Sequence, residues 1–396
     1  MTTIIKQKID SIAECISDKI QNDRVEDDFG LYSGDFGILL FLIYYSNYST
    51  TSDKYISLIE KFTEDVFNRF PKNIGIHTFC DGLSGILYSL EFLQEKKYVD
   101  IDISDAQSTF DEYLCFCMRQ NIQQNNYDFL HGALGVGFYF LKKGNNSYIQ
   151  ELIDFLYNTA EIDKQNKICK WKSIIDFEKK TIGYNISLSH GISSIIIFLS
   201  RVIKSGKIND KVLELLHGAV NYVLSQQIDF LRIGSHFPIF SLDNKTQPII
   251  GSRLAWCYGD LGVGMALWQA GKAAGELTWT EKGLGVLINA TQRLSMTENN
   301  VFDAGICHGS AGIALVYHRM YLETHINEFK EATDYWLNQT INIAKFEDGL
   351  AGYKSYIFDG WNCNYSLLSG ISGIGLTLIS CIDNSKQKWD EMLLLS

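Results

Sequence analysis

Two kinds of apolar pattern alternate along the chain. Short runs that are apolar on nearly every face, such as 38–45, 136–141 and 192–199, predict helices that are buried all round. Between these runs lie segments with apolar residues at helical spacing and a polar opposite face, namely 52–69, 104–123, 209–231, 277–294 and 326–344. This second pattern predicts outer helices with one face toward solvent. The alternation therefore favours an all-α fold built from paired inner and outer helices.

Each all-apolar run follows a repeated glycine signal. Aligned on Gly-x-x-Gly, the first glycines of the seven copies are Gly34, Gly82, Gly132, Gly191, Gly259, Gly309 and Gly370, and the fourth copy has Ser194 in place of its second glycine. They lie 48, 50, 59, 68, 50 and 61 residues apart, which is enough for two helices and two turns per repeat. We expect seven inner and seven outer helices in one α/α-toroid domain over 1–396. A linear helical solenoid is the alternative, but its inner helices would expose a long concave face.

The intervals on either side of the fourth repeat are longer than those before it, and they contain the segments 164–186 and 232–251. Both segments combine β-branched and aromatic residues, and the second holds Pro238 and Pro248, two of the three prolines. These features favour short strands over helix, although neither segment is long enough to be stable alone. We predict that the two segments form one small β-containing extension of the toroid.

Charge and cysteine content narrow the class of function. The 35 Lys and Arg against 46 Asp and Glu give a net charge of −11, which argues against binding to nucleic acid. The longest apolar run, 37–45, is far short of the roughly 20 residues that span a bilayer. The first residues carry Lys6, Lys8 and Asp10 where a signal peptide would be apolar. Nine cysteines without CxxC pairs are typical of reduced thiols, so we expect a cytoplasmic protein.

The residues just before the first glycine of each copy should gather at one end of the toroid. All seven are polar: Ser33, Asp81, His131, His190, Tyr258, His308 and Ser369. One position earlier, three of the seven copies have cysteine: Cys80, Cys257 and Cys307. Helix N-termini favour anionic groups such as thiolate. The repeats therefore predict a polar, thiol-bearing pocket at this end.

Cys257, Cys307 and His308 form the strongest candidate site. They come from repeats five and six, which we expect to be neighbours, and packed helices lie about 8–10 Å apart. Two thiolates and one imidazole suit Zn²⁺, and three protein ligands leave an open position, as in catalytic zinc centres. We therefore predict one zinc ion per chain, held by these three residues.

Four further residues near the same end are candidates for proton transfer or charge stabilisation. His190 occupies the mouth position of repeat four and could act as a general acid or base, with His131 in the same register one repeat away. Asp128 could orient a histidine or handle a proton, but a surface aspartate would look the same. Arg253 and Tyr258 could stabilise developing negative charge, or could merely balance carboxylates.

Three motifs accompany the recurrent GxxG signal: Trp256-Cys257-Tyr258-Gly259, Cys307-His308-Gly309 and Ser189-His190-Gly191. In these motifs the chain resembles the lanthionine synthetase C-like family of lantibiotic cyclases. The resemblance runs from Gly34 to Gly370 and is closer to stand-alone cyclases than to fused bifunctional synthetases, since no long dehydratase domain precedes it. The family folds as an α/α toroid with a small β-rich extension. The resemblance implies zinc ligands at Cys257, Cys307 and His308, and catalytic roles for His190, Asp128, Arg253 and Tyr258.

The resemblance also implies an activity and its partners. The activity is addition of peptide cysteine thiols to dehydroalanine or dehydrobutyrine, which forms lanthionine and methyllanthionine rings. The partners would be a dehydrated precursor peptide with its leader, and a dehydratase and an export transporter in a biosynthetic complex at the membrane periphery. The leader could dock on 164–186 and 232–251, because loops on a rigid scaffold commonly carry binding, or these segments could be ordinary insertions.

Three other functions are compatible with parts of the pattern. A zinc-containing protein prenyltransferase also alkylates a peptide thiol, but no cluster of Lys and Arg marks a diphosphate site among the mouth positions. A toroidal glycoside hydrolase could use Asp81 and Asp128 as its two carboxylates, which would leave the cysteines unexplained. A non-catalytic member of the same fold could bind glutathione or a partner protein through the same zinc.

Overall fold

The computed structural model describes residues 2–22, 28–49, 52–69, 75–101, 103–176, 180–245, 248–357, 359–383 and 387–396. The chain divides into two compact units. Unit 1 comprises residues 1–101 with 301–396, and unit 2 comprises residues 102–300. That the whole chain acts as a single domain stays a prediction.

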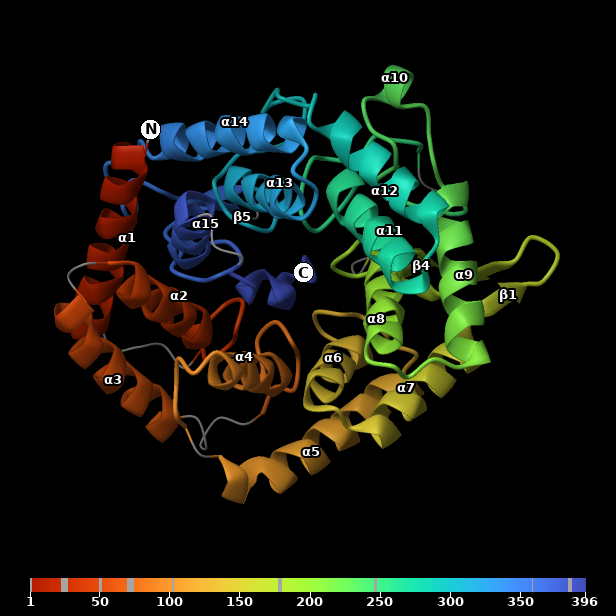
Figure 1. Cartoon of the computed structure of the whole chain (residues 1–396), viewed down its shortest axis with the longest axis horizontal. Coiled ribbons are helices and arrows are strands. Elements are labelled where there is room, and N and C mark those ends of the chain that lie inside the picture. The colour runs from red at the N-terminus through yellow and green to blue at the C-terminus, as the bar shows by residue number, and fades with distance from the viewer. Residues whose placement is uncertain are drawn as a thin grey trace. The chain divides into compact units, whose positions relative to one another are not determined.

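Unit 1 alternates outer and inner helices (Figure 1). The outer helices are α1 (Thr2–Asn22), α3 (Ser52–Arg69) and α14 (Asn327–Ile343). The inner helices are α2 (Asp35–Tyr48), α4 (Leu83–Glu95), α13 (Ser310–Thr324) and α15 (Ile371–Asp383), and the short 3-10 helix η2 (Trp389–Leu393) follows them. The inner helices are buried along most of their length, whereas α1 and α14 each bury one stripe, as their apolar spacing predicts.

Repeats from the two ends of the chain are neighbours in unit 1. Helix α15 packs against both α2 and α13. The loops before these helices are joined by backbone hydrogen bonds, because Cys307 N–H donates to the Leu368 carbonyl and Leu368 N–H donates to the Tyr32 carbonyl, each at 2.9 Å. A linear solenoid would leave its first and last repeats apart. The contact of repeat seven with repeat one therefore excludes the solenoid alternative.

Unit 2 follows the same alternation. Its outer helices are α5 (Ser104–Gln123), α7 (Asn146–Thr159), α9 (Asp210–Ser225) and α12 (Leu277–Ala290). Its inner helices are α6 (Ala133–Lys143), α8 (Ile192–Lys204) and α11 (Asp260–Ala274), and one short helix, α10 (Phe230–Ile233), precedes α11. Helix α8 packs against both α6 and α11. The described part of the chain thus holds the seven inner and seven outer helices that the sequence predicts.

The loops that begin the inner helices share one hydrogen-bond plan. Six residues before the first glycine, a side-chain oxygen accepts the backbone N–H two residues on, at Asp28, Asn126, Asn185, Asp303 and Asn364. Four residues before that glycine, a side-chain oxygen accepts the N–H of the residue just before the glycine, at Thr78, Asp128, Ser187 and Ser366. Side chains of these types satisfy backbone donors in turns. The shared plan explains why each inner helix begins at the same point of its repeat.

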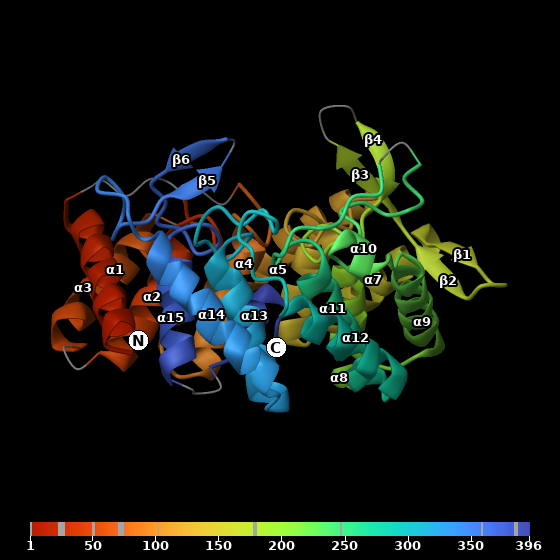
Figure 2. The ribbon, with the colours of Figure 1, turned by 90° about the horizontal axis from the view of Figure 1, so that it is seen from above.

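Three small antiparallel hairpins stand on this helical framework (Figure 2). Unit 2 carries β1 (Glu161–Asp163) paired with β2 (Ile168–Lys170), and β3 (Lys172–Asp176) paired with β4 (Thr181–Tyr184). Unit 1 carries β5 (Ser355–Ile357) paired with β6 (Gly360–Asn362), a hairpin that the sequence pattern did not predict.

The segments 164–186 and 232–251 differ in structure. The first carries β2, β3 and β4, whereas the second holds an isolated bridge between Pro238 and Gly251 in place of a strand. Asn244 joins them, because its side-chain amide accepts from the backbone N–H of Tyr184 at 2.7 Å and donates to its carbonyl at 3.0 Å. Residues 177–179 and 246–247 of these segments lie outside the described residues. That the two act as one extension stays a prediction.

Among the described residues, no helix combines the length and the apolar character that crossing a membrane would need.

Candidate functional site

A cavity of about 640 Å³ lies in unit 2 at the end where the inner helices begin. Its walls come from the loop before α6, strand β3, the loop before α8 and Tyr258 before α11. His131, His190 and Tyr258, the residues just before the first glycine of three successive repeats, all line it. Strand β3 adds the apolar side chains of Ile174 and Ile175. Polar groups from the helix starts therefore meet an apolar wall in one cavity, the usual composition of a ligand pocket.

Asp128 and His190 form a hydrogen-bonded pair in this cavity. Nδ1 of His190 donates to Oδ2 of Asp128 at 2.6 Å, and the two side chains are 31% and 17% exposed, in that order. Because a carboxylate only accepts, Nδ1 carries the hydrogen and Nε2 is the nitrogen that can exchange a proton. Burial disfavours the charged imidazole, but the hydrogen bond and the negative charge of Asp128 outweigh it and raise the pKa of His190. This pair is suited to acid–base chemistry near neutral pH.

The two carboxylate oxygens of Asp128 have different roles. One makes a loop hydrogen bond that other repeats also have, and the other makes a bond that those repeats do not have. Its Oδ1 accepts the backbone N–H of His131 at 2.8 Å. A hydroxyl accepts the equivalent bond in three other repeats, at Thr78, Ser187 and Ser366. A hydroxyl has no second oxygen, whereas the carboxylate has Oδ2 left to bind His190. Asp128 thus holds its own loop and orients a histidine of the next repeat.

Tyr258 and His131 flank His190. The Tyr258 ring centroid lies 6.3 Å from that of His190, and the Asn185 side-chain amide donates to the Tyr258 hydroxyl at 3.4 Å. Burial raises the pKa of Tyr258, so its hydroxyl keeps its proton at neutral pH and can donate a hydrogen bond. The exposed His131 stacks on His190 with centroids 6.0 Å apart.

The loop before α11 departs from the shared plan. Arg253 stands six residues before Gly259, where five other loops have Asp or Asn, and its guanidinium makes no hydrogen bond or ion pair with the described residues. Gly259 has φ +84°, whereas the glycines that cap five other inner helices have negative φ. A Cβ at Gly259 would lie 2.3 Å from Ser252 Oγ. Glycine is therefore required here, and Arg253 is left with a free cationic head for an anionic group.

Asp260, the first residue of α11, fixes this loop through hydrogen bonds. Its buried carboxylate accepts the backbone N–H groups of His236 and Phe237, each at 3.0 Å. Arg293 donates to the same carboxylate at 3.1 Å and to the Ser252 carbonyl at 2.6 Å. Buried charges are tolerated when they are paired and hydrogen-bonded in this way. Part of the segment 232–251 is thus built into the base of the loop that carries Cys257.

The three predicted zinc ligands are divided between the units. In unit 2, the buried Cys257 precedes α11, and its carbonyl accepts the backbone N–H groups of Leu188 and Ser189 at 3.1 and 3.3 Å. In unit 1, the partly exposed Cys307 and His308 precede α13. Thiol and imidazole donors are the types that zinc prefers, so the residues fit this ion. That the three share one ion stays a prediction.

Asp303 supports the loop of unit 1 that carries the predicted ligands Cys307 and His308, and the sequence analysis did not single it out. Its carboxylate is nearly fully buried and accepts the backbone N–H of Gly305 at 3.0 Å and that of Tyr356 at 2.8 Å. The same carboxylate lies 3.9 Å from Nε2 of His308. A carboxylate behind a histidine ligand commonly fixes the orientation of the imidazole.

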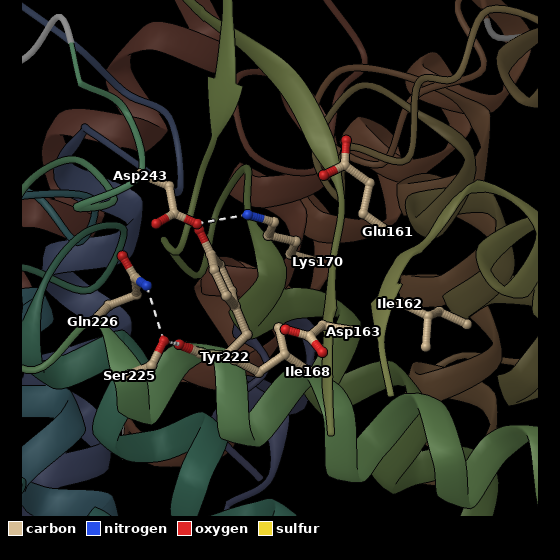
Figure 3. Close-up of a pocket in the computed structure, with 9 residues that line it drawn as sticks. All are labelled: Glu161, Ile162, Asp163, Ile168, Lys170, Tyr222, Ser225, Gln226 and Asp243. Atoms are coloured by element: carbon tan, nitrogen blue, oxygen red, sulfur yellow. Dashed lines mark hydrogen bonds and ion pairs between the residues drawn. The ribbon is translucent and has the colours of Figure 1, made fainter. Parts of the chain in front are cut away.

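A second cavity in unit 2, of about 330 Å³, is lined by β1, β2, α9 and Asp243 (Figure 3). Lys170 Nζ lies 2.7 Å from Asp243 Oδ2 and 4.2 Å from the centre of the Tyr184 ring. Glu161 pairs with Lys172 at 2.8 Å. Because these charges are already paired, this cavity is better suited to binding than to acid–base chemistry.

Comparisons with known proteins point to one family. The family model described as lanthionine synthetase C-like protein matches residues 25–394. Nisin biosynthesis protein NisC of Lactococcus lactis subsp. lactis is 24% identical in an alignment of 341 positions, and the match covers 78% of this chain and 78% of that protein.

A solved structure shares the fold of this chain. The structure of nisin cyclase aligns with a TM-score of 0.78 at 20% identity, over 99% of this chain and 97% of that chain. This match confirms the fold class predicted from the repeats. A possible member of the GH105 family from Salmonella enterica aligns over 97% of this chain with a TM-score of only 0.40, which is too weak to indicate shared chemistry. The extent of the family match shows that the chain belongs to the lanthionine synthetase C-like family.

Proposed function

We propose that this protein is a zinc-dependent lanthipeptide cyclase, which adds cysteine thiols of a precursor peptide to dehydroalanine and dehydrobutyrine residues of the same peptide. Membership of the family and similarity to nisin cyclase support this class of activity. The observation that carries the proposal is the Asp128–His190 pair in the unit 2 cavity, because thioether formation needs a placed proton donor.

Cys257, Cys307 and His308 would hold the zinc ion. Each lies one or two residues before the glycine that begins an inner helix, where the helix dipole favours a thiolate. A free thiol has a pKa of about 8.5 and is mostly protonated at neutral pH. When bound, zinc would supply the peptide thiol as thiolate at this pH. Two anionic protein ligands favour activation of a thiol over a strong Lewis-acid role.

His190 would deliver the proton that completes each ring. Attack of the thiolate sulfur on the β-carbon forms the C–S bond and moves the π electrons of the alkene toward the adjacent carbonyl, as an enolate. The α-carbon then takes a proton from His190 Nε2, which leaves the imidazole neutral, and the proton released by the peptide thiol restores the imidazolium. Asp128 favours this charged form, because it raises the pKa of His190.

Arg253 and Tyr258 would stabilise the enolate. The Arg253 guanidinium has no anionic partner among the described residues, and the Tyr258 hydroxyl keeps its proton. Donors aimed at developing negative charge lower the barrier most when they are fixed beforehand, as the loop bonds around Gly259 and Asp260 provide.

Replacing His190 tests the proposal. His190→Asn should slow cyclisation by about 10²-fold, the usual scale for one acid–base group, while zinc content stays near that of the wild type. Cyclisation rates and metal analysis on the same preparations give both readouts. Unimpaired cyclisation in a zinc-loaded variant would assign His190 to packing.

We further propose that the leader of the precursor docks at the junction of 164–186 and 232–251, where the second cavity lies (Figure 3). In this proposal the protein works in the cytoplasm with a dehydratase and an export transporter. Ile168→Glu would place a charge in the cavity wall and should weaken leader binding about tenfold, whereas Ile208→Glu, at a position 56% exposed elsewhere in unit 2, should not. Unchanged leader affinity in a folded Ile168→Glu variant would refute docking at this cavity.

A point variant is a better probe here than deletion of 234–248. His236 and Phe237 lie in that stretch, and their backbone N–H groups satisfy the buried carboxylate of Asp260. Deletion would leave that carboxylate short of partners, which costs stability independently of any leader.

A further inference from the structure

Four aromatic rings form a continuous row on unit 1, which we call the aromatic face: Phe302, Tyr356, Trp361 and Phe346. Ring centroids lie 5.2 Å apart between Phe302 and Tyr356, and 5.1 Å apart between Tyr356 and Trp361. The row ends at Phe346, whose centroid is 4.8 Å from that of Trp361. Phe302 and Trp361 are each 42% exposed. Tyr356 and Phe346 are partly exposed. A contiguous group of aromatic rings that reaches solvent marks an interaction surface, whereas single exposed apolar residues are ordinary.

The β5–β6 hairpin turns its aromatic side outward. Tyr356 and Trp361 are cross-strand partners, so their side chains lie on the same face of the hairpin. Ser355, one residue before Tyr356, lies on the opposite face and is buried, and its hydroxyl donates to the carbonyl of Ser369 just before α15. One face of the hairpin is therefore fastened to unit 1, and the other face carries the two rings.

Asp303 connects the aromatic face to the loop that carries Cys307 and His308. Its carboxylate binds Tyr356 N–H on the hairpin and Gly305 N–H on the loop. Phe302 directly precedes Asp303 and lies six residues before His308. The aromatic face and two of the proposed zinc ligands thus belong to one hydrogen-bonded assembly within unit 1.

We propose that the aromatic face binds the core segment of the precursor peptide, through apolar side chains next to the reacting cysteine. The proposal rests on the cyclase function proposed above. When the peptide thiol lies beside Cys307 and His308, the peptide residues next to the reacting cysteine lie against the aromatic face. Flat rings accept apolar side chains of different shapes without a fixed hydrogen-bond pattern. Such a surface suits an enzyme that must hold several positions of one peptide in turn.

The charges beside the aromatic face favour a peptide over a membrane. Lys354 lies next to Phe346, but its ammonium pairs with Asp348 at 2.6 Å. On the other side the Tyr356 hydroxyl donates to the Asp359 carboxylate at 3.4 Å. Anionic lipid surfaces attract clusters of unpaired Lys and Arg, and the whole chain carries a net charge of −11. An uncharged apolar peptide segment is the better match.

Binding of a dehydrated precursor peptide with alkylated thiols tests this proposal without any chemistry. Fluorescence anisotropy of the labelled peptide is measured with zinc-loaded wild type, Phe302→Ala and Trp361→Ala. Phe116→Ala is the matched control, because this phenylalanine is 59% exposed on α5 in unit 2. We expect each variant of the aromatic face to bind about fivefold more weakly, the scale of one aromatic contact, and the control to bind as the wild type does.

Cyclisation kinetics add a second readout. Loss of uniform binding raises KM and leaves kcat unchanged, so KM should rise about fivefold in both variants while zinc content stays the same. Trp361→Phe keeps a ring and should keep most of the affinity, which separates loss of a contact from unfolding of the hairpin.

Two results would overturn the proposal. One is unchanged peptide affinity in both folded variants. The other is binding of the wild type, but not of the variants, to vesicles of phosphatidylglycerol and phosphatidylcholine with peptide affinity intact, which would assign the face to a membrane. Failure of the proposed function looks different: a wild type that binds the blocked peptide through this face but closes no rings would refute cyclisation alone.

Discussion

Replacing Asp128 by serine separates the two roles of this side chain. Serine already occupies the same position in repeats four and seven, where the hydroxyls of Ser187 and Ser366 accept the equivalent loop N–H. Asp128→Ser should therefore keep the loop before α6 and lose only the bond to His190. The variant removes one interaction of the proposed acid–base pair and retains the local fold.

The expected loss follows from the geometry of the pair. The bond spans 2.6 Å between side chains that are both less than one third exposed. Hydrogen bonds to charged groups contribute about 1.5–3 kcal/mol, and each 1.36 kcal/mol of barrier is tenfold in rate. If the bond supports the proton donor in the transition state, kcat should fall by about 10- to 150-fold.

The pH dependence should change in a defined direction. With Asp128 gone, burial is no longer opposed by a neighbouring carboxylate, so the pKa of His190 should fall. A proton donor loses activity as pH rises through its pKa, and this loss should therefore occur at lower pH in Asp128→Ser than in the wild type.

The assay measures kcat of cyclisation across pH, together with zinc content and melting temperature. Ser366→Ala is the control, because it removes a loop bond of the kind that Asp128→Ser keeps, in a repeat that carries none of the proposed catalytic residues. A folded, zinc-loaded Asp128→Ser with a wild-type kcat and pH profile would refute the assigned role. A large loss of stability in Asp128→Ser would show that the carboxylate mainly supports its loop.

Three further outcomes can be measured directly. Cys307→Ala should lose bound zinc in metal analysis yet stay folded by circular dichroism, since the core is far larger than the site; full metal retention would make this ligand assignment wrong. Gly259→Ala should lower the free energy of unfolding by about 1–2 kcal/mol, because φ is +84° there. Gly285→Ala should not lower the free energy of unfolding, because a Cβ there meets nothing within 4 Å. Equal denaturation midpoints for Gly259→Ala and Gly285→Ala would contradict the reasoning. Burial lowers the pKa of His318 from 6.5 to about 4, so the unfolded chain binds a proton that the folded chain does not between these values. His318 should therefore lower the free energy of unfolding by about 1.4 kcal/mol for each pH unit between about 6.5 and about 4, and the pH profile of His318→Leu should be less steep; parallel pH profiles of the two proteins would contradict this.

The repeated glycine signal and the two apolar patterns were sufficient to predict the helical framework. A helix that is apolar on every face is stable only in the interior, whereas an amphipathic helix is stable at the surface with its apolar face inward. The apolar pattern of a helix therefore predicts its layer. The common register of the repeats also predicted that His131, His190 and Tyr258 would lie together, and these residues line one cavity in unit 2.

Individual side-chain pairs depend on loop geometry, which the spacing of apolar residues does not predict. Asp128 and His190 are separated by 62 residues in sequence, yet the alignment of the repeats distinguishes Asp128 from its equivalents. Among the residues four before the first glycine, Asp128 is the one carboxylate, and the others are hydroxyl residues, glycine or alanine. Arg253 likewise replaces the Asp or Asn of five other loops. A residue that departs from a shared structural plan is a candidate for function, and both of these residues belong to the site proposed above.

The remaining differences come from short elements. Strands β5 and β6 have three residues each, too few for an alternating pattern to distinguish them from loop. His236 and Phe237 bind the Asp260 carboxylate through their backbone N–H groups. The identities of their side chains do not reveal such a contact.

The most direct test of the cyclase proposal counts free thiols in a dehydrated precursor peptide before and after incubation with the zinc-loaded protein. Addition of a thiol to a dehydrated residue leaves the mass of the peptide unchanged but removes one alkylatable thiol for each ring. We predict that labelling by iodoacetamide falls by one adduct per ring at constant peptide mass, and that His190→Asn slows this loss. A peptide that binds to the protein and keeps all of its thiols would contradict cyclisation and favour a binding role for this member of the family.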